Sequence, residues 1–339
     1  MKLILREFDL FLKHAFNIAH DSRTVQKTLI VELKAEENSG FGEATRSVYY
    51  HNSIEQMAEV LDKNRDIIES YNYEPPEIFW EKLNPFFKGN SFALSAVDCA
   101  INDLYAKYQG KSLIDLWKLD NTDLPLSNYT IGIDEIPVMV KKLKEFQWPL
   151  YKIKLGTNED IEIIKELRKH TKASFRVDAN CGWGVDETIR NAKIMKELGV
   201  EFIEQPLNAD DWEGMKTVYK KSDLPIIADE SIVAEADVKK CVDHFHGVNI
   251  KLMKCGGLTP TRRMIDTARK LGLKTMVGCM TESSVGIAAV AQLLPLLDYV
   301  DMDGSLLISN DIAKGPVLAN NSVELPQHAG IGIETLIVS

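Results

Sequence analysis

Three acidic residues stand at nearly equal intervals in the second half of the chain, each at the end of an apolar run. Asp178, Glu204 and Asp229 are separated by 26 and 25 residues, about the length of one strand–helix unit. On neighbouring parallel strands their oxygens would converge as hard ligands for Mg²⁺ and leave coordination positions for substrate oxygens. A single acidic residue at such a place is as often a helix cap, but three in succession predict one metal site.

Lysines end two further strand-like runs. Lys152 and Lys154 are two residues apart, so on a strand both side chains point to the same side, and Lys251 ends a later run. Crowding of ammonium groups, burial and a nearby divalent cation all lower the pKa of a lysine toward the range of a working base. Lys154 and Lys251 on opposite sides of a barrel predict racemisation or epimerisation with one base on each face. We expect Lys254 only to reach toward solvent.

The elements that position these residues are short strand-like runs alternating with amphipathic helical segments beyond about residue 124. Polar residues at the carboxyl ends of such strands line the catalytic mouth of a parallel (β/α) barrel. The fold class expected is α/β, a modified (β/α)7–8 barrel whose eighth helix, at 308–318, is short. The expected strands are 127–133, 150–155, 174–179, 201–204, 225–228, 247–252, 274–278 and 298–302.

Residues 1–123 have a different pattern and predict an α+β domain. Two strand-like runs at 1–11 and 28–33 precede Gly40-Phe41-Gly42-Glu43, where the glycines suit a tight turn or bulge, and a helical period follows at 93–108. We therefore expect this domain, a barrel at 124–318, and a strand-like segment at 319–339 that returns to pack on the first domain.

Composition excludes several classes of partner. The chain carries 40 basic and 50 acidic residues, a net charge of −10, without the basic cluster that nucleic-acid binding needs. No apolar run approaches the 18 or so residues of a membrane span, and charges interrupt the N-terminal residues where a signal peptide would be apolar. Five cysteines without a Cys-x-x-Cys pair suggest unpaired thiols in a reducing compartment. We expect a cytoplasmic protein, and the sequence is compatible with a homo-oligomer as well as with a monomer.

Five motifs together resemble the enolase superfamily in its muconate-lactonising subgroup, over almost the whole chain. They are Lys152-Ile-Lys154, Asp178-Ala-Asn180, Glu204-Gln-Pro206, Ala228-Asp-Glu-Ser231 and Lys251-Leu-Met-Lys-Cys-Gly-Gly257. The resemblance implies that residues 1–123 cap the barrel and that loss of a substrate α-proton gives an enediolate in a Mg²⁺-dependent reaction. It also implies that Lys152 stabilises the enediolate beside the substrate carboxylate.

Asp301-Met-Asp303 places two carboxylates on one side of the eighth strand, a pair that favours a cation. The pair resembles the one by which dipeptide epimerases bind the α-ammonium group of their substrate. The resemblance thus implies a Mg²⁺-dependent epimerase acting on the C-terminal residue of a dipeptide such as Ala-Glu, with peptidoglycan recycling as the family's usual role. N-acyl amino acid racemases, cycloisomerases and o-succinylbenzoate synthases of the same subgroup are alternatives, as are a lyase with an imine at Lys251 and a binding module without activity.

Substrate side chains are expected to contact loops of the capping domain, at 16–25 and 47–53. Relatives acting on Ala-Glu carry an arginine in the first loop, for which Arg23 is the candidate. Counting back from the strand at 28–31 places that position nearer Asp21, so a small or apolar dipeptide such as Ala-Ala is also possible. The residues after the expected strand at 274–278 resemble a segment that orients the dipeptide: Cys279, Met280, Thr281 and Glu282. A hydrogen bond to a catalytic lysine is an alternative role for Glu282.

Overall fold

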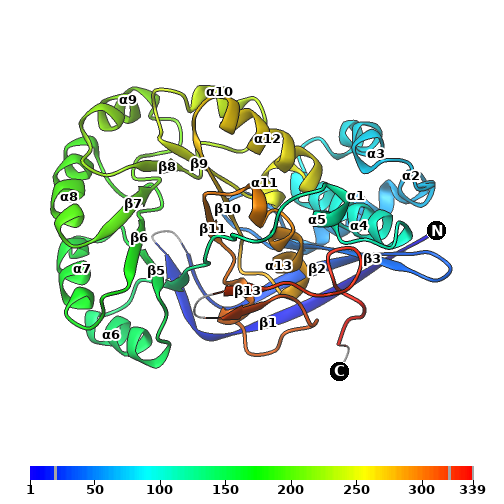
Figure 1. Cartoon of the computed structure of the whole chain (residues 1–339), viewed down its shortest axis with the longest axis horizontal. Helices are drawn as coiled ribbons and strands as arrows, with labels where there is room; N and C mark the ends of the chain where they lie inside the picture. The colour runs from blue at the N-terminus through cyan, green and yellow to red at the C-terminus, as the bar shows by residue number, and fades with distance from the viewer. Residues whose placement is uncertain (19–20, 320–321, 338–339) are drawn as a thin grey trace.

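The capping domain begins with an antiparallel sheet. The computed structural model describes residues 1–18, 21–319 and 322–337, so parts of the predicted 16–25 loop and of the C-terminal segment lie outside the described residues. Strands β1 (Lys2–Ile18), β2 (Asp21–Lys34) and β3 (Ser39–Thr45) pair in that order. The first predicted loop is therefore largely the end of a long β1–β2 hairpin, which reaches from the cap toward the barrel in Figure 1.

Helix α4 packs closely against strand β3 because two glycines lie at their contact. A Cβ atom at Gly40 would lie 2.1 Å from the carbonyl oxygen of Ala100, and one at Gly42 would lie 2.0 Å from that of Ala96. The prediction of a tight turn at these glycines is wrong, since they lie inside a strand and permit close approach of a helix. The cap helices are α1 (Ile54–Lys63), α2 (Arg65–Glu69), α3 (Pro76–Leu83), α4 (Ser91–Tyr108) and α5 (Leu113–Leu116).

Eight parallel strands follow, and each pairs with the next along the chain. A parallel bridge between Ser127 and Val300 brings the first and last strands together, so the barrel is nearly closed. The predicted fold class and the eight strands are confirmed, with ends that differ by at most two residues. The strands are β4 (Tyr129–Ile131), β5 (Leu150–Lys154), β6 (Ser174–Asp178), β7 (Val200–Glu204), β8 (Ile226–Ala228), β9 (Gly247–Ile250), β10 (Lys274–Gly278) and β11 (Tyr299–Asp301).

Helices surround the barrel on its outer side, with the capping domain beside it (Figure 1). The eighth helix comes earlier and is shorter than predicted, since Gly304–Leu307 is helical and 308–318 is not. The barrel helices are α6 (Ile136–Glu145), α7 (Asp160–Arg168), α8 (Val185–Glu197), α9 (Trp212–Lys221), α10 (Asp237–Lys240), α11 (Leu252–Cys255), α12 (Leu258–Lys270), α13 (Ser284–Ala291) and α14 (Gly304–Leu307).

The C-terminal segment contacts helix α4 of the cap. It contains a small hairpin of β12 (Val317–Ala319) and β13 (Ser322–Glu324), so much of the strand pattern expected there is irregular chain. Farther on, the backbone N–H of Ile331 donates to Asp103 at 2.8 Å, and the Lys107 amine donates to the carbonyl of Ile333 at 2.6 Å. The boundaries at 123 and 318 stay predictions.

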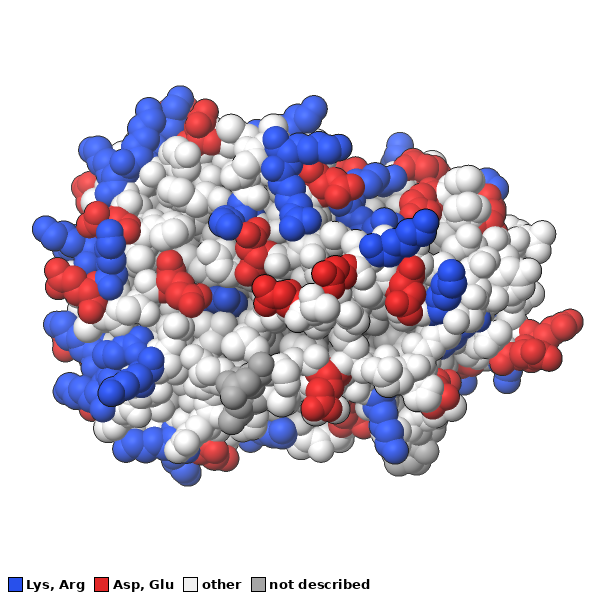
Figure 2. All heavy atoms as spheres, in the orientation of Figure 1, with Lys and Arg blue, Asp and Glu red and all other residues white. Residues whose placement is uncertain are grey.

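Charged side chains of both signs are interspersed on the face shown in Figure 2. Short-range ion pairs also occur along helix α7, where Lys165 pairs with Glu162, and Lys169 at the end of the helix pairs with Glu166. Within the described ranges, no helix combines the length and the apolar character that a membrane crossing requires.

Candidate active site

Strand register places the predicted metal ligands side by side. Lys154 is the direct Cα partner of Asp178, which in turn is the partner of Glu204, and Asp229 follows the end of β8. All three acidic side chains are fully buried, and each offers a carboxylate oxygen within 4.8 Å of the other two. The structure therefore brings together the three acidic residues expected from the sequence.

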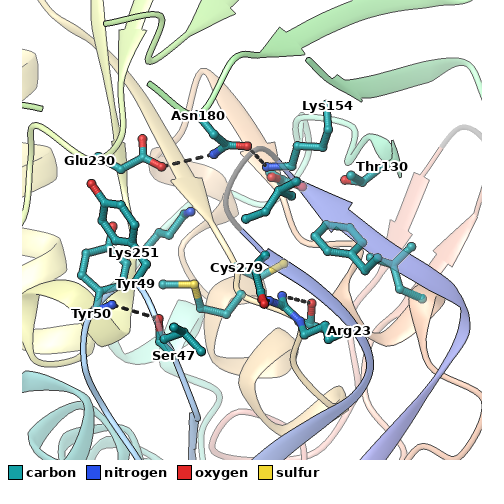
Figure 3. Close-up of a pocket in the computed structure, with 18 of the residues that line it drawn as sticks. Arg23, Ser47, Tyr49, Tyr50, Thr130, Lys154, Asn180, Glu230, Lys251 and Cys279 are labelled. Atoms are coloured by element: carbon teal, nitrogen blue, oxygen red, sulfur yellow. Dashed lines mark hydrogen bonds and ion pairs between the residues drawn. The ribbon is translucent and has the colours of Figure 1, made fainter. Parts of the chain in front are cut away.

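The three predicted lysines meet the same carboxylates. Lys152 Nζ lies 2.8 Å from Glu204 and 3.1 Å from Asp178, and Lys154 Nζ lies 2.6 Å from Asp178. Lys251 Nζ approaches from another part of the ring and lies 2.8 Å from Asp229. Figure 3 shows Lys154 and Lys251 on different sides of one pocket, as two bases on opposite faces require.

The environments of Lys152 and Lys251 differ from the expectation of a lowered pKa. Burial opposes the charged form of Lys152, but the carboxylates of Asp301 and Glu204 outweigh it and hold its pKa well above the ordinary value. Burial likewise opposes the charge on Lys251, and Asp229 nevertheless raises its pKa. For these two lysines the paired carboxylates outweigh both burial and the neighbouring ammonium groups.

The carboxylates themselves have divergent pKa values. Burial favours the neutral form of each, but Lys154 lowers the pKa of Asp178, and Lys251 with Lys254 lowers that of Asp229 well below its usual range. For Glu204, burial and the neighbouring Asp178 raise the pKa to about 8. Crowded carboxylates of this kind favour a divalent cation among them, because it compensates their charges.

The donor set therefore fits Mg²⁺. Asp178, Glu204 and Asp229 offer only oxygen atoms, which suits a hard cation better than a soft one. When bound there, Mg²⁺ would compensate the negative charge of the carboxylates that pair with the lysines, and it would attract a substrate carboxylate.

Asp301 at the end of strand β11 and Asp303 two residues later both line the pocket. Asp301 accepts hydrogen bonds from Lys152 at 2.8 Å and from the Asn128 amide at 2.7 Å, whereas Asp303 accepts one from the backbone N–H of Thr130 at 2.5 Å. Burial raises the pKa of both, but Lys152 brings that of Asp301 to about 2, while burial and Asp301 raise that of Asp303 to about 8. A cation bound between them would stabilise both as anions.

The cap and the barrel together line a pocket of about 650 Å³. The end of the β1–β2 hairpin contributes Arg23, and the segment 47–53 contributes Tyr49 and Tyr50. The Arg23 guanidinium lies 2.5 Å from Asp21, donates to Thr281 at 3.0 Å, and stands over the Phe16 ring. Arg23 thus reaches the pocket, but its charge is paired within the protein.

The side chains that follow strand β10, the seventh strand of the barrel, point in different directions. Cys279, Met280 and Thr281 line the pocket, as expected. Glu282 is not among the described residues that line it, and its carboxylate accepts a hydrogen bond from the Met280 backbone at 2.6 Å. The side chain turns into the protein near Glu43, where burial raises its pKa to about 8, so its expected roles toward substrate or a lysine stay predictions.

Four residues of the site were missed or misread in the sequence. Lys254 does not reach solvent but is 2% exposed, with its amine 2.6 Å from both the carbonyl and the carboxylate of Asp229. Glu43 accepts hydrogen bonds from the Ser283 side chain and backbone at 2.6 and 3.0 Å, joining the cap to the segment below the pocket. Asn180 and Glu230 line the pocket beside the metal ligands, and their adjacency to Asp178 and Asp229 was the signal for them.

A capped barrel with carboxylates and lysines at its mouth is the arrangement expected from the enolase resemblance, and comparison with known proteins agrees. Residues 4–117 match the family described as mandelate racemase / muconate lactonizing enzyme, N-terminal domain, and residues 138–336 match enolase C-terminal domain-like proteins. The chain belongs to the mandelate racemase and muconate lactonizing enzyme family of the enolase superfamily. The resemblance seen in the sequence is confirmed.

Individual relatives are epimerases. An L-Ala-D/L-amino acid epimerase from Flavobacterium johnsoniae is 58% identical over 99% of this chain and 100% of its own length. The L-Ala-D/L-Glu epimerase from Bacillus subtilis, in a substrate-liganded complex, has a TM-score of 0.95 at 25% identity, over 100% of this chain and 99% of that one. A dipeptide epimerase from Methylococcus capsulatus, complexed with Mg and the dipeptide L-Arg-D-Lys, has a TM-score of 0.90 at 29% identity, over 98% of this chain and 100% of that one.

Proposed function

We propose that the protein is a Mg²⁺-dependent dipeptide epimerase that inverts the α-carbon of the C-terminal residue of its substrate. The observation that carries this proposal is one pocket lined by two lysines on opposite sides and by the Asp301–Asp303 pair, with a buried triad of carboxylates in contact with those lysines. The names of its relatives support the same reaction.

In this reaction, Lys154 and Lys251 are the two bases. One removes the α-proton from one face and the other returns a proton to the opposite face, which inverts the carbon without net change. Lys152, which contacts two residues of the acidic triad, stabilises the enediolate by donating to its developing negative charge. Asp178, Glu204 and Asp229 are the residues that hold Mg²⁺.

Asp301 and Asp303 bind the free α-ammonium group of the substrate. Their carboxylates belong to the same pocket as the lysines, so the ammonium group is fixed relative to the α-carbon that reacts. Thr281, Met280 and Cys279, with Arg23 from the cap, surround the remainder of the dipeptide. An N-acylated substrate lacks the cation, and its acyl group would bring no charge to compensate the two aspartates.

The test is epimerisation of defined dipeptides, followed by chiral chromatography. With Mg²⁺, we expect L-Ala-L-Ala, L-Ala-L-Phe or L-Ala-L-Glu to yield the isomer inverted at the second residue, and EDTA to stop the reaction. The N-acetyl forms of the same dipeptides should react far more slowly. Faster turnover of the N-acetyl forms would instead favour an N-acyl amino acid racemase, and full activity in EDTA would contradict the metal dependence.

We also propose a cytoplasmic location and a role in recycling cell-wall dipeptides. Five free cysteines support a reducing compartment. Cell fractionation with immunodetection tests the location, and recovery of the protein outside the cytoplasm would contradict it.

A further inference from the structure

A chain of hydrogen bonds leads from Glu230 through Asn180 to Lys154. The Asn180 amide nitrogen donates to Glu230 Oε1 at 3.2 Å, and the Lys154 amine donates to Asn180 Oδ1 at 3.3 Å. Both bonds are drawn in Figure 3, where the three side chains run along one rim of the pocket. Asn180 is buried, and Glu230 Oε2 is shielded from solvent and has no hydrogen-bond partner among the described residues.

The order of the chain fixes which end of the amide faces the lysine. A carboxylate accepts hydrogen bonds, so Glu230 takes the NH₂ end of Asn180 and turns its oxygen toward Lys154. A reversed amide would set its oxygen against the carboxylate and its NH₂ group against the amine. The Asn180 backbone has a φ of 41°, and its N–H donates to Asp178 at 3.0 Å, which holds the residue in this turn.

Lys154 needs such a partner because its other contact is shared. Asp178 lies 2.6 Å from the Lys154 amine, but the same carboxylate belongs to the acidic triad. An amide oxygen is neutral and accepts a hydrogen bond from an ammonium group and from a neutral amine alike. The Asn180 contact can therefore persist through proton transfer, and it restricts a long side chain that otherwise has many rotamers.

We propose that Glu230 and Asn180 are positioning residues for Lys154, with Glu230 orienting the amide and the amide oxygen aiming the amine at one face of the substrate. The inference rests on the proposed epimerase function. Lys251, the base for the other face, is held by Asp229 instead. The charge of Glu230 also acts on Lys251. Loss of the Asn180 side chain should therefore affect proton transfer on one face of the substrate and spare the other.

The test is exchange of the α-proton in D₂O, measured in substrate recovered without inversion, because such exchange needs only one base. Each isomer of the second residue is incubated separately, and the isomer that loses exchange in Lys154→Ala is the one that faces Lys154. Asn180→Gly removes only the side chain, since glycine adopts a positive φ without strain. Glu230→Gln keeps size but allows either amide orientation, and Glu235→Gln is a matched control at a surface ion pair with Arg263.

We expect Asn180→Gly to slow exchange in the isomer facing Lys154 by about tenfold or more, with Glu230→Gln giving a smaller loss in the same isomer. In Asn180→Gly, exchange in the other isomer should stay within about twofold of the unmodified enzyme, as should both isomers in the Glu235→Gln control. Equal losses in both isomers of Asn180→Gly, or no loss in either, would overturn the proposal.

A second measurement separates this inference from the proposed function. Reductive methylation with formaldehyde and cyanoborohydride, quantified by peptide mass spectrometry, reports the exposure and reactivity of each lysine amine without any substrate. In Asn180→Gly, methylation of Lys154 should rise relative to Lys251. If the unmodified protein shows no α-proton exchange, the epimerase proposal fails, and this ratio alone decides the positioning role: an unchanged ratio would overturn it.

Discussion

The side-chain amine of Lys152 lies 2.8 Å from the carboxylate of Asp301 and so connects strands β5 and β11, which flank β4 in the nearly closed barrel. This ion pair connects the acidic triad, which Lys152 also contacts, to the aspartate pair proposed to bind the ammonium group. Both partners are buried, so loss of either leaves an uncompensated charge. The two ends of the substrate site are thus coupled through one lysine.

This coupling predicts different kinetic effects for the two aspartates. Asp301→Asn should lower kcat, because it disturbs Lys152 at the developing negative charge as well as weakening ammonium binding. Asp303→Asn should chiefly raise KM, because Asp303 bonds the Thr130 backbone and has no direct ion pair with Lys152 in the described structure. A loss of at least about thirtyfold in kcat/KM is expected for each.

Steady-state kinetics with one free dipeptide measures both parameters. Asp298→Asn, at a surface ion pair with Lys274, is the matched control and should change neither. Identical changes of kcat and KM in the two active-site variants would contradict the distinct roles.

Replacement of either base should abolish epimerisation but not all proton exchange. Lys154→Ala leaves Lys251 to remove and return a proton on its own face, and Lys251→Ala does the reverse. Each variant should incorporate deuterium into one isomer of the second residue without inverting it, and the two variants should differ in which isomer is labelled. Proton NMR in D₂O follows both isomers, and full epimerisation by either variant would exclude the two-base assignment.

Much of the fold and the centre of the site were predictable because each depends on a local pattern. The apolar runs that form barrel strands are short and end in charged residues, so Lys154, Asp178 and Glu204 could be assigned to neighbouring strands by spacing alone. Alternation along a strand then correctly placed Lys152 beside Lys154 in the barrel, with Tyr151 bonding outward to the α6 region.

The missed residues lie where alternation and spacing no longer apply. Asn180 follows the end of β6 with a positive φ, so strand geometry gives no direction for its side chain. Lys254 lies in the one-turn helix α11, and its amine pairs with Asp229, which follows strand β8. Glu43 is explained only by the packing of the cap on the barrel, which brings it to Ser283, 240 residues away in the sequence.

The pairing of Arg23 with Asp21 predicts how the enzyme responds to an acidic second residue. Because Asp21 already compensates the guanidinium, Ala-Glu gains little from Arg23 in the unmodified protein. Asp21→Asn frees that charge and should raise kcat/KM for Ala-Glu several-fold relative to Ala-Ala. The further change Arg23→Leu in that background should remove the gain. If neither substitution changes kcat/KM for Ala-Glu relative to Ala-Ala, Arg23 does not contact the side chain of the second residue.

Asp98 of helix α4 predicts a pH dependence of stability. Burial raises its pKa to about 7, although the backbone and hydroxyl of Thr259 in α12 donate to it at 2.8 Å. An unfolded aspartate has a pKa near 3.9, so between about pH 4 and 7 the folded state binds the extra proton. The free energy of unfolding should therefore fall as pH rises through this window, by a few kcal/mol from this group.

Urea unfolding at pH 4.5 and pH 7.5 measures this contribution in the intact chain and in Asp98→Asn. The asparagine cannot ionise and can still bond Thr259, so the variant should lose less stability between the two pH values. Equal pH dependence in both proteins would show that Asp98 does not carry the proton.

The central claim is that the α-proton of the second residue of a free dipeptide is exchanged by a metal-dependent pair of lysines. The most direct test incubates the protein with Mg²⁺ and free L-Ala-L-Phe in D₂O and locates the label by tandem mass spectrometry. We predict one deuterium at the α-carbon of the phenylalanine, none at the alanine, and none in either residue with EDTA. Deuterium at the alanine α-carbon, or labelling that persists in EDTA, would contradict the account.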